Sequence, residues 1–273
     1  MNTYTRAIKA LARQLLIAKP DLQLSASGAV SHWPENLLAG INREWFEADL
    51  NSGDGNELAG KFRAAHSSSA LAVNPFARFR PDCSALSVFG SSEFQTLQLE
   101  AKCPVGIGRG TSPNLDLLLR RKGVVIGIES KCTEHIRTHE PKFAEAYSKR
   151  IVDERRKSAW FSCMEQAIQE PLRYRYLDVA QLTKHAFGLA YNFPNDEVCL
   201  LYLFWEPSNA SDFEEFRVHR NEVALFSSEV ANSFPSFKAF SYRDLWATWD
   251  SLTSPSWIKE HLTNIRERYN TEI

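Results

Sequence analysis

Two short apolar runs separated by a basic, glycine-containing turn constrain the fold of this chain more than any other feature. Residues 115–119 and 124–128 are rich in β-forming side chains, and Arg-Arg-Lys-Gly occupies positions 120–123 between them. This pattern predicts an antiparallel hairpin with its turn near Lys122-Gly123. The prediction fixes which polar side chains of the two strands face each other.

A turn at that position places Asp116 and Glu129 at equal distances from it, on opposite strands. We expect them to face each other with β-carbons about 5 Å apart. Because side chains alternate along a strand, Glu129 and Lys131 project from one face and Ser130 from the other. A slip of one residue in the pairing would separate the two carboxylates, so the expectation depends on the turn.

Two neighbouring carboxylates repel each other unless a cation lies between them. Mg²⁺ fits such a place because it binds one or two carboxylates together with water and substrate phosphate. Lys131 would then orient a water molecule or help to deprotonate it, while the ion polarises a phosphoryl oxygen. The same residues also fit a structural reading, in which Glu129 and Lys131 form an ordinary ion pair and Asp116 lies at a strand edge.

The segment Pro113-Asn114-Leu115-Asp116, followed after twelve residues by Glu129-Ser130-Lys131, resembles the signature of the PD-(D/E)XK nuclease superfamily. The wider chain, including residues 57–66 and the segment ending at Pro207, resembles bacterial restriction endonucleases within it. The resemblance implies an α/β fold with an αβββαβ core, in which helices flank a mixed central sheet. It also implies Mg²⁺-dependent hydrolysis, with Mn²⁺ able to substitute and DNA as the expected substrate.

The expected core elements follow from local patterns. Asn56 is suited to cap a helix over residues 57–66, and residues 94–101 read as the first strand, before the hairpin. Apolar spacing predicts a second helix over residues 178–191. The continuous apolar run 198–205 predicts a buried strand.

The resemblance assigns roles by position. Asp116 and Glu129 would bind the metal, the Ser130 carbonyl would add a ligand, and Lys131 would position the attacking water. A glutamate of the first helix completes the metal site in many members of the superfamily, and Glu57 stands there.

Several side chains keep alternative interpretations. Glu100, at the end of the first strand, competes with Glu57 for the metal role, and Glu57 also fits an exposed pair with Lys61. Gln181 and His185 share one helix face. Some superfamily members carry a glutamine and a tyrosine at this spacing, so Gln181 is a candidate catalytic residue, whereas the histidine is a departure.

Positions flanking the motif are less specific. Glu134 would support the metal site, order Arg137, or be a solvated charge. His66 and residues 67–69 fit either phosphate contact or a helix end.

The net charge of −1 means that nucleic acid would have to bind through local basic patches. Residues 120–122, 149–157 and 173–176 are the candidates. In the last of these, Arg-Tyr-Arg-Tyr suits phosphate contact with base stacking. Each patch also fits a solvated face.

With 273 residues and 44% hydrophobic content, the chain suits one elaborated domain. We expect a helical N-terminal extension (1–55), a catalytic core (56–131 and 178–206), an insertion that is helical near 144–168 (132–177), and a C-terminal extension (207–273). The apolar residues of this last extension have helical spacing and should pack on the core. A homodimer is left open.

Five dispersed cysteines without a C-x-x-C pair give no zinc-ribbon spacing and suggest a reducing cytoplasm. No apolar run reaches the length that a membrane span needs, so we expect a cytoplasmic protein with no membrane partner. The alternative to a nuclease is a nuclease-fold module that binds nucleic acid or a protein without cutting.

Overall fold

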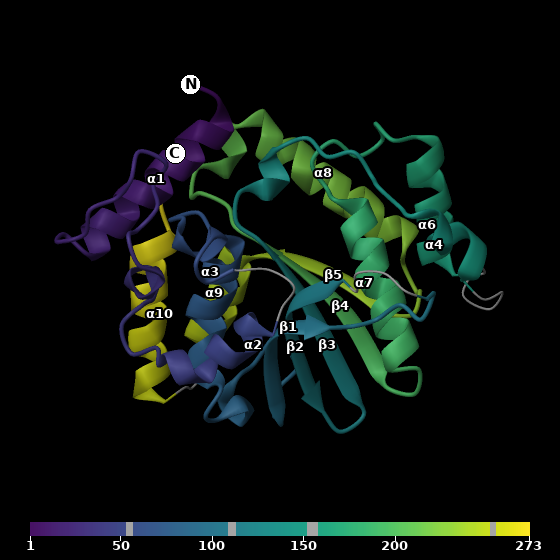
Figure 1. The fold of residues 1–273 in the computed structure, drawn as a ribbon, viewed down its shortest axis with the longest axis horizontal. Helices are drawn as coiled ribbons and strands as arrows, with labels where there is room; N and C mark the ends of the chain where they lie inside the picture. Colours follow the sequence, from purple (N-terminus) through teal and green to yellow (C-terminus); the bar gives the residue numbers. More distant parts are fainter. Residues whose placement is uncertain (53–56, 109–112, 152–157, 252–254) are drawn as a thin grey trace.

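The computed structural model describes residues 1–52, 57–108, 113–151, 158–251 and 255–273. Its centre is a five-stranded sheet in the order β1-β2-β3-β4-β5 (Figure 1). The first three strands are antiparallel neighbours, and β4 and β5 run parallel to β3. This is the mixed sheet that the sequence predicts. The strands are β1 (Thr96–Lys102), β2 (Asn114–Arg121), β3 (Val124–Lys131), β4 (Glu197–Phe204) and β5 (Ser236–Ser241).

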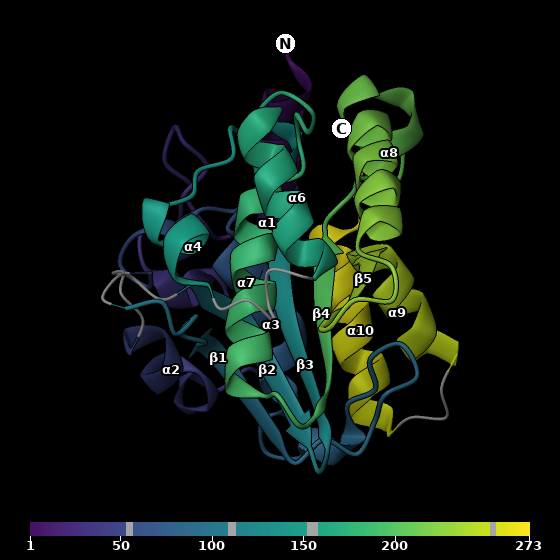
Figure 2. The same cartoon turned by 90° about the vertical axis from the view of Figure 1, so that its right-hand side faces the viewer.

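Helices cover both faces of the sheet, and each face has its own apolar core (Figures 1 and 2). One core contains residues of α1 (Thr3–Ala18), α2 (Glu47–Asn51), α3 (Ser68–Phe76), α9 (Tyr242–Ser251) and α10 (Ser256–Tyr269). The other contains residues of α4 (Glu145–Arg150), α6 (Ala159–Gln169), α7 (Val179–Asn192) and α8 (Glu214–Glu229). The molecule is therefore a three-layer α/β/α fold.

Short 3₁₀ turns connect these elements. They span Trp33–Asn36, Arg43–Trp45, Lys61–Arg63, Ala77–Phe79, Cys83–Ala85, Glu134–Ile136 and Ala210–Asp212. Among the described residues, no helix is both long and apolar enough to cross a bilayer.

The predicted hairpin is confirmed. The strands β2 and β3 are separated by Lys122-Gly123, and Gly123 has a φ of +73°, a left-handed conformation that glycine adopts without strain. Leu117 pairs with Ile128. The paired register ends there, and the carboxylate of Asp116, the preceding residue of β2, accepts the Ser130 N–H at 2.7 Å. The expected facing of Asp116 and Glu129 stays a prediction.

The predicted helix over residues 57–66 is wrong. Residues 57–60 form turns and Lys61–Arg63 a 3₁₀ turn, and the helix before β1 is α3, which begins at Ser68. The Ser67 side chain caps it by accepting a hydrogen bond from the Ala70 N–H, and the helix residues from Ala70 to Phe76 are all buried. The order α3-β1-β2-β3-α7-β4 nevertheless retains the expected αβββαβ core. Asn56, the expected cap, lies outside the described residues.

The later core elements are confirmed. The helix α7 starts one residue after its cap Asp178, whose carboxylate accepts the Gln181 N–H at 2.9 Å, and β4 matches the predicted strand to within one residue. A Cβ at Gly188 would lie 2.3 Å from the Cys103 carbonyl oxygen. Only glycine permits this close approach of α7 to the chain that follows β1, and the approach sets the height of α7 over the sheet.

The extensions are partly as expected. The insertion contributes α4 and α6, and α9 and α10 bury the tail residues on the core as predicted, for example Trp246 and Leu262. The C-terminal region also supplies α8 and the edge strand β5, which the sequence patterns did not predict. This region therefore completes the sheet as well as covering it.

Candidate functional site

The pairing of β1 with β2 is interrupted beside the predicted carboxylates. The register passes from Leu99 opposite Leu117 to Ala101 opposite Leu115, and Glu100 between them has a φ of +48°. Leu99 packs in one core and Ala101 in the other, so β1 switches faces at Glu100. Local distortions of this kind redirect side chains at strand ends.

A cavity of about 690 Å³ lies at this end of the sheet. The beginnings of α3, α7 and β2 and the ends of β1 and β3 contribute to its walls. Every residue that the sequence assigns to catalysis or metal binding contributes to its lining. These residues are Glu57, Asp116, Glu129, Ser130, Lys131 and Gln181, and the competing Glu100 lines it too.

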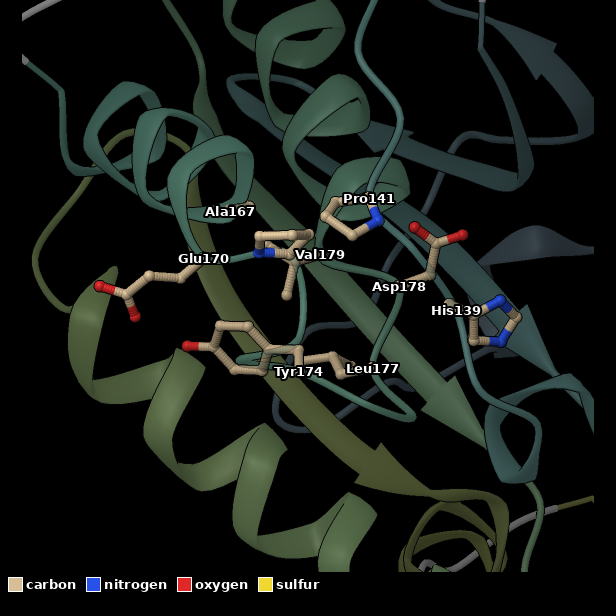
Figure 3. Close-up of a pocket in the computed structure, with 9 residues that line it drawn as sticks. His139, Pro141, Ala167, Glu170, Tyr174, Leu177, Asp178 and Val179 are labelled. Atoms are coloured by element: carbon tan, nitrogen blue, oxygen red, sulfur yellow. The ribbon is translucent and has the colours of Figure 1, made fainter.

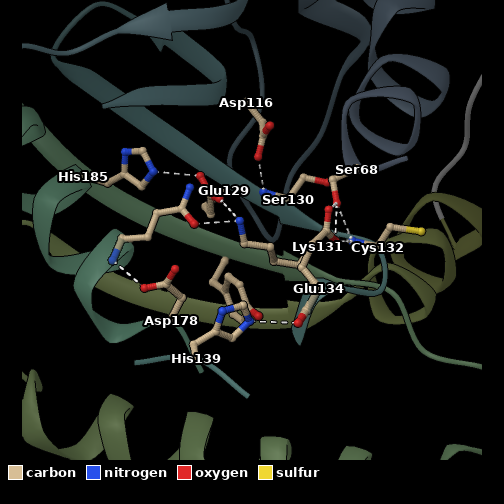
Figure 4. Close-up of polar contacts among 12 residues, drawn as sticks. Ser68, Asp116, Glu129, Ser130, Lys131, Cys132, Glu134, His139, Asp178 and His185 are labelled. Atoms are coloured by element: carbon tan, nitrogen blue, oxygen red, sulfur yellow. Dashed lines mark hydrogen bonds and ion pairs between the residues drawn. The ribbon is translucent and has the colours of Figure 1, made fainter. Parts of the chain in front are cut away.

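A buried network holds the motif glutamate and lysine (Figure 4). Lys131 Nζ donates to Glu129 Oε1 at 2.5 Å and to Gln181 Oε1 at 2.7 Å. The second oxygen of Glu129, Oε2, lies 2.8 Å from His185 Nε2. Gln181 and His185 therefore share a helix face as predicted, and both reach the motif from α7. His185, the departure from the superfamily pattern, contacts the carboxylate directly.

This network fixes the charges of its central pair. Burial would raise the pKa of Glu129, but Lys131 and His185 outweigh it and hold that pKa at about 2. Burial would lower the pKa of Lys131, but Glu129, Glu134 and Asp116 raise it above its ordinary range. Lys131 is therefore an ammonium at neutral pH. Its charge suits it to orient a water molecule or stabilise an oxyanion rather than to act as a base.

The other two strand carboxylates carry the opposite perturbation. Burial, followed by the charge of Glu129, raises the pKa of Asp116 well above its ordinary value, although the carboxylate accepts the Ser130 N–H at 2.7 Å. Burial, Glu57 and Glu129 raise the pKa of Glu100 to about 7. The cavity therefore holds more carboxylate charge than its own lysines neutralise, as a cation-binding site does.

Glu57 has both of the contacts that the sequence left open. It lies in the cavity, where Ser69 Oγ donates to it at 3.1 Å, and its other oxygen lies 3.6 Å from Lys61 Nζ. Ser130 faces away, and its Oγ lies 2.7 Å from the Tyr242 hydroxyl. That orientation confirms the predicted alternation, and a metal-ligand role of the Ser130 carbonyl stays a prediction.

The role of Glu134 could not be chosen from the sequence. Its carboxylate accepts the Ser68 hydroxyl at 2.7 and 2.6 Å and the Thr133 N–H at 3.0 Å. The Cys132 N–H donates to both Ser68 Oγ and Glu134 Oε2. Glu134 is therefore no solvated charge: it ties the first turn of α3 to the chain immediately after Lys131. The only sequence signal was the serine run preceding the apolar helix.

One basic patch does not stack bases. Tyr174 and Tyr176 are each only 7% exposed. The Tyr174 hydroxyl donates to Glu229, which also pairs with Arg173. The predicted stacking role of these two rings is therefore wrong. In the patch over residues 149–157, positions 152–157 lie outside the described part of the chain.

A divalent ion fits the chemistry of this donor set. Hard cations select carboxylate oxygens, and Asp116 and Glu100 are carboxyl groups whose pKa values are raised by burial and by neighbouring carboxylates. Within the described ranges, no three His, Cys, Asp or Glu side chains are already arranged around one metal position. Mg²⁺ keeps several waters and commonly uses only one or two carboxylates, so Asp116 and Glu129 remain sufficient.

Comparison with known families agrees with this geometry. The model of the REase-ARP family, described as Restriction Endonuclease associating with ARP, matches residues 12–269. The chain belongs to this family. Its membership supports a restriction-endonuclease-like protein and points to nucleic acid as partner. No curated protein and no solved structure matches the chain.

The perturbed Glu100 gives this REase-ARP protein a pH-dependent stability. Between pH 4.5 and about 7 the folded state retains a proton on Glu100 that the unfolded chain releases. The free energy of unfolding should therefore fall as pH rises through this window, by on the order of 3 kcal/mol. The free energy of unfolding, measured by urea denaturation at pH 5 and at pH 8, should therefore differ less between the two pH values in Glu100→Gln than in the wild type.

The raised pKa of Asp116 should also make the free energy of unfolding fall as pH rises, and this contribution remains in Glu100→Gln. Glu165→Gln, an exposed carboxylate of α6, is the matched control and should follow the wild type. A Glu100→Gln profile parallel to that of the control would show that Glu100 ionises normally. Mg²⁺ at pH 8 should raise the melting temperature of the wild type more than that of Glu100→Gln.

Proposed function

We propose that this chain is a metal-dependent nuclease of the PD-(D/E)XK superfamily that hydrolyses phosphodiester bonds in DNA. The observation that carries the proposal is the convergence of Asp116, Glu129 and Lys131 in one cavity, with Gln181 bound to the lysine. A structural ion pair on a strand requires neither the surplus carboxylates nor a cavity of this size. Both follow directly from a site that binds a cation and a phosphate.

Asp116 and Glu129 would hold Mg²⁺ or Mn²⁺, with the Ser130 carbonyl as a further ligand and Glu57 or Glu100 in support. When bound, the ion supplies Lewis-acid polarisation of the phosphoryl oxygen and a more acidic water. The residues of the chain do the positioning. His185 Nε2, which lies 2.8 Å from Glu129 Oε2, would orient this carboxylate, and Gln181 would orient Lys131 by accepting a hydrogen bond from its Nζ.

Lys131 has a specific task in this arrangement. An ammonium carries three N–H donors, and contacts with Glu129 and Gln181 use two of them. The third can hold the attacking water or a phosphoryl oxygen. Attack of this water on phosphorus, in line with the departing 3′-oxygen, leaves a 5′-phosphate, the usual product of the superfamily.

A second candidate is a nuclease-fold module that binds nucleic acid or a protein without cutting it. It is favoured by the fact that Lys131 already forms an ion pair with Glu129, and by the lack of a preassembled three-residue metal group among the described residues. Calorimetric titration with Mg²⁺ or Mn²⁺ separates the two candidates. Heat of binding that disappears in Asp116→Ala supports the nuclease, and no binding even with DNA present supports the module.

The direct test is cleavage. Linear, circular, single-stranded and methylated DNA should each be incubated with the protein in Mg²⁺, in Mn²⁺ and in excess EDTA, and the ends of any product mapped. We expect metal-dependent cleavage that leaves 5′-phosphates and stops in EDTA. Absence of cleavage of every substrate in both metals, or undiminished cleavage in EDTA, would contradict the proposal.

A further inference from the structure

A second cavity has a volume of about 780 Å³. Its first lining residues follow directly in sequence on those of the cavity of about 690 Å³ around Lys131, which we call the catalytic cavity. Arg137 lines the catalytic cavity, and the next two residues, Thr138 and His139, line the second. The complete lining is Thr138, His139, Glu140, Lys142, Leu172, Tyr174 and Arg175. These residues come from two segments of the insertion, before α4 and after α6.

Hydrogen bonds hold His139, which lines the second cavity, to both neighbouring segments of the chain. The His139 N–H donates to the Arg175 carbonyl at 2.9 Å, which joins the two segments. The His139 Nε2 lies 2.8 Å from the Glu134 carbonyl, and Glu134 is bound to Ser68 beside the catalytic lysine (Figure 4). The second cavity is therefore fixed relative to Lys131.

A smaller cavity that shares lining residues with the second cavity is too small to bind a ligand (Figure 3). It lies between the end of α6 and the start of α7, with His139 and Tyr174 in its lining, and its volume is about 10 Å³. That volume holds at most one water molecule.

The charge of the second cavity indicates the kind of ligand. Lys142 and Arg175 are both exposed, and the lining contains a single carboxylate, that of Glu140. Within the part of the chain that the structure describes, neither cation forms an ion pair. Arg175 lies 5.2 Å from the Tyr176 ring, which supports its guanidinium from the protein side. Arg137, which precedes these residues and lines the catalytic cavity, is a further exposed cation.

We propose that the second cavity binds the sugar-phosphate backbone of the nucleic acid as it leaves the catalytic cavity, with Lys142 and Arg175 contacting phosphates. This inference rests on the proposed nuclease function and adds where the substrate lies. Unpaired cations beside a catalytic cavity fit a polyanion that must continue past the cleaved bond. In a chain of net charge −1, such local cations supply the attraction that the whole protein lacks.

The test measures binding separately from cleavage. Fluorescence anisotropy of a labelled DNA oligonucleotide, without divalent cations and over a range of salt concentrations, gives affinity and its salt dependence. The double variant Lys142→Ala/Arg175→Ala should bind more weakly whatever the base sequence. The slope of log affinity against log salt concentration should be less negative by about 2, which is roughly 1 for each lost phosphate contact. Glu140→Gln should bind more tightly than wild type.

The matched control is Lys238→Ala/Lys259→Ala, which removes the same charge from exposed positions on β5 and α10. It should keep the wild-type slope. Equal slopes in the two double variants, or no binding of the oligonucleotide by the wild type, would overturn the inference. In cleavage, Lys142→Ala/Arg175→Ala should raise KM and keep kcat, whereas loss of the proposed function itself would appear as Asp116→Ala cleaving at the wild-type rate.

Discussion

Asp116→Ala and Lys131→Ala should each reduce DNA cleavage to background while the far-ultraviolet circular dichroism stays unchanged. Asp116 is the carboxylate whose pKa is raised by burial and by the charge of Glu129, and Lys131 is the ammonium that has a third donor for the cavity. Single-turnover cleavage with saturating enzyme measures the effect independently of DNA affinity.

The two variants differ in their expected stability. Asp116→Ala leaves only the Ser130 N–H without its acceptor, at a cost of about 1–3 kcal/mol. Lys131→Ala removes a partner of the buried, ionised Glu129 and should cost about 3–5 kcal/mol. Asp116→Asn keeps an acceptor for the Ser130 N–H, so it should be inactive at nearly full stability. This variant therefore separates loss of the carboxylate from loss of stability as the cause of inactivity. Full activity of purified Asp116→Asn or Lys131→Ala would exclude the assigned site, and Glu165→Ala should stay active.

The β2–β3 hairpin was predictable because its determinants are local. The turn at Gly123 fixes the pairing of β2 with β3, and alternation then decides that Glu129 and Lys131 share a face. The same reasoning identified Gln181 and His185 as neighbours, since four residues complete about one helical turn. In each case the information lies within a few residues of the element.

The missed features depend on contacts between distant parts of the chain. The hydrogen bond of Ser68 to Glu134 joins positions 66 residues apart, and β5 is a strand because β4 offers an open edge to it. The interruption at Glu100 depends on how β1 meets β2. The helix predicted at 57–66 failed for a different reason: its apolar spacing was helical, but the cap at Ser67 and the buried run after it begin the helix later.

His185→Ala should lower both cleavage and stability. The variant would leave Oε2 of a buried carboxylate without its 2.8 Å partner and create a cavity, so we expect a loss of about 2–4 kcal/mol of unfolding free energy. The freed carboxylate would no longer be held toward the site. Partners that orient a metal-binding side chain typically contribute 10–100-fold to activity, and we expect a fall of about that size.

Two further variants distinguish orientation from packing. Thr183 is buried on the same helix, and its hydroxyl has no hydrogen-bond partner among the described residues, so Thr183→Ala should change stability without changing activity per folded molecule. His185→Gln restores a donor that can reach Glu129 and should recover part of the cleavage rate. Equal activity of folded His185→Ala and Thr183→Ala would mean that the histidine only packs. A selective loss in His185→Ala that the glutamine rescues would show that α7 sets the direction in which Glu129 points.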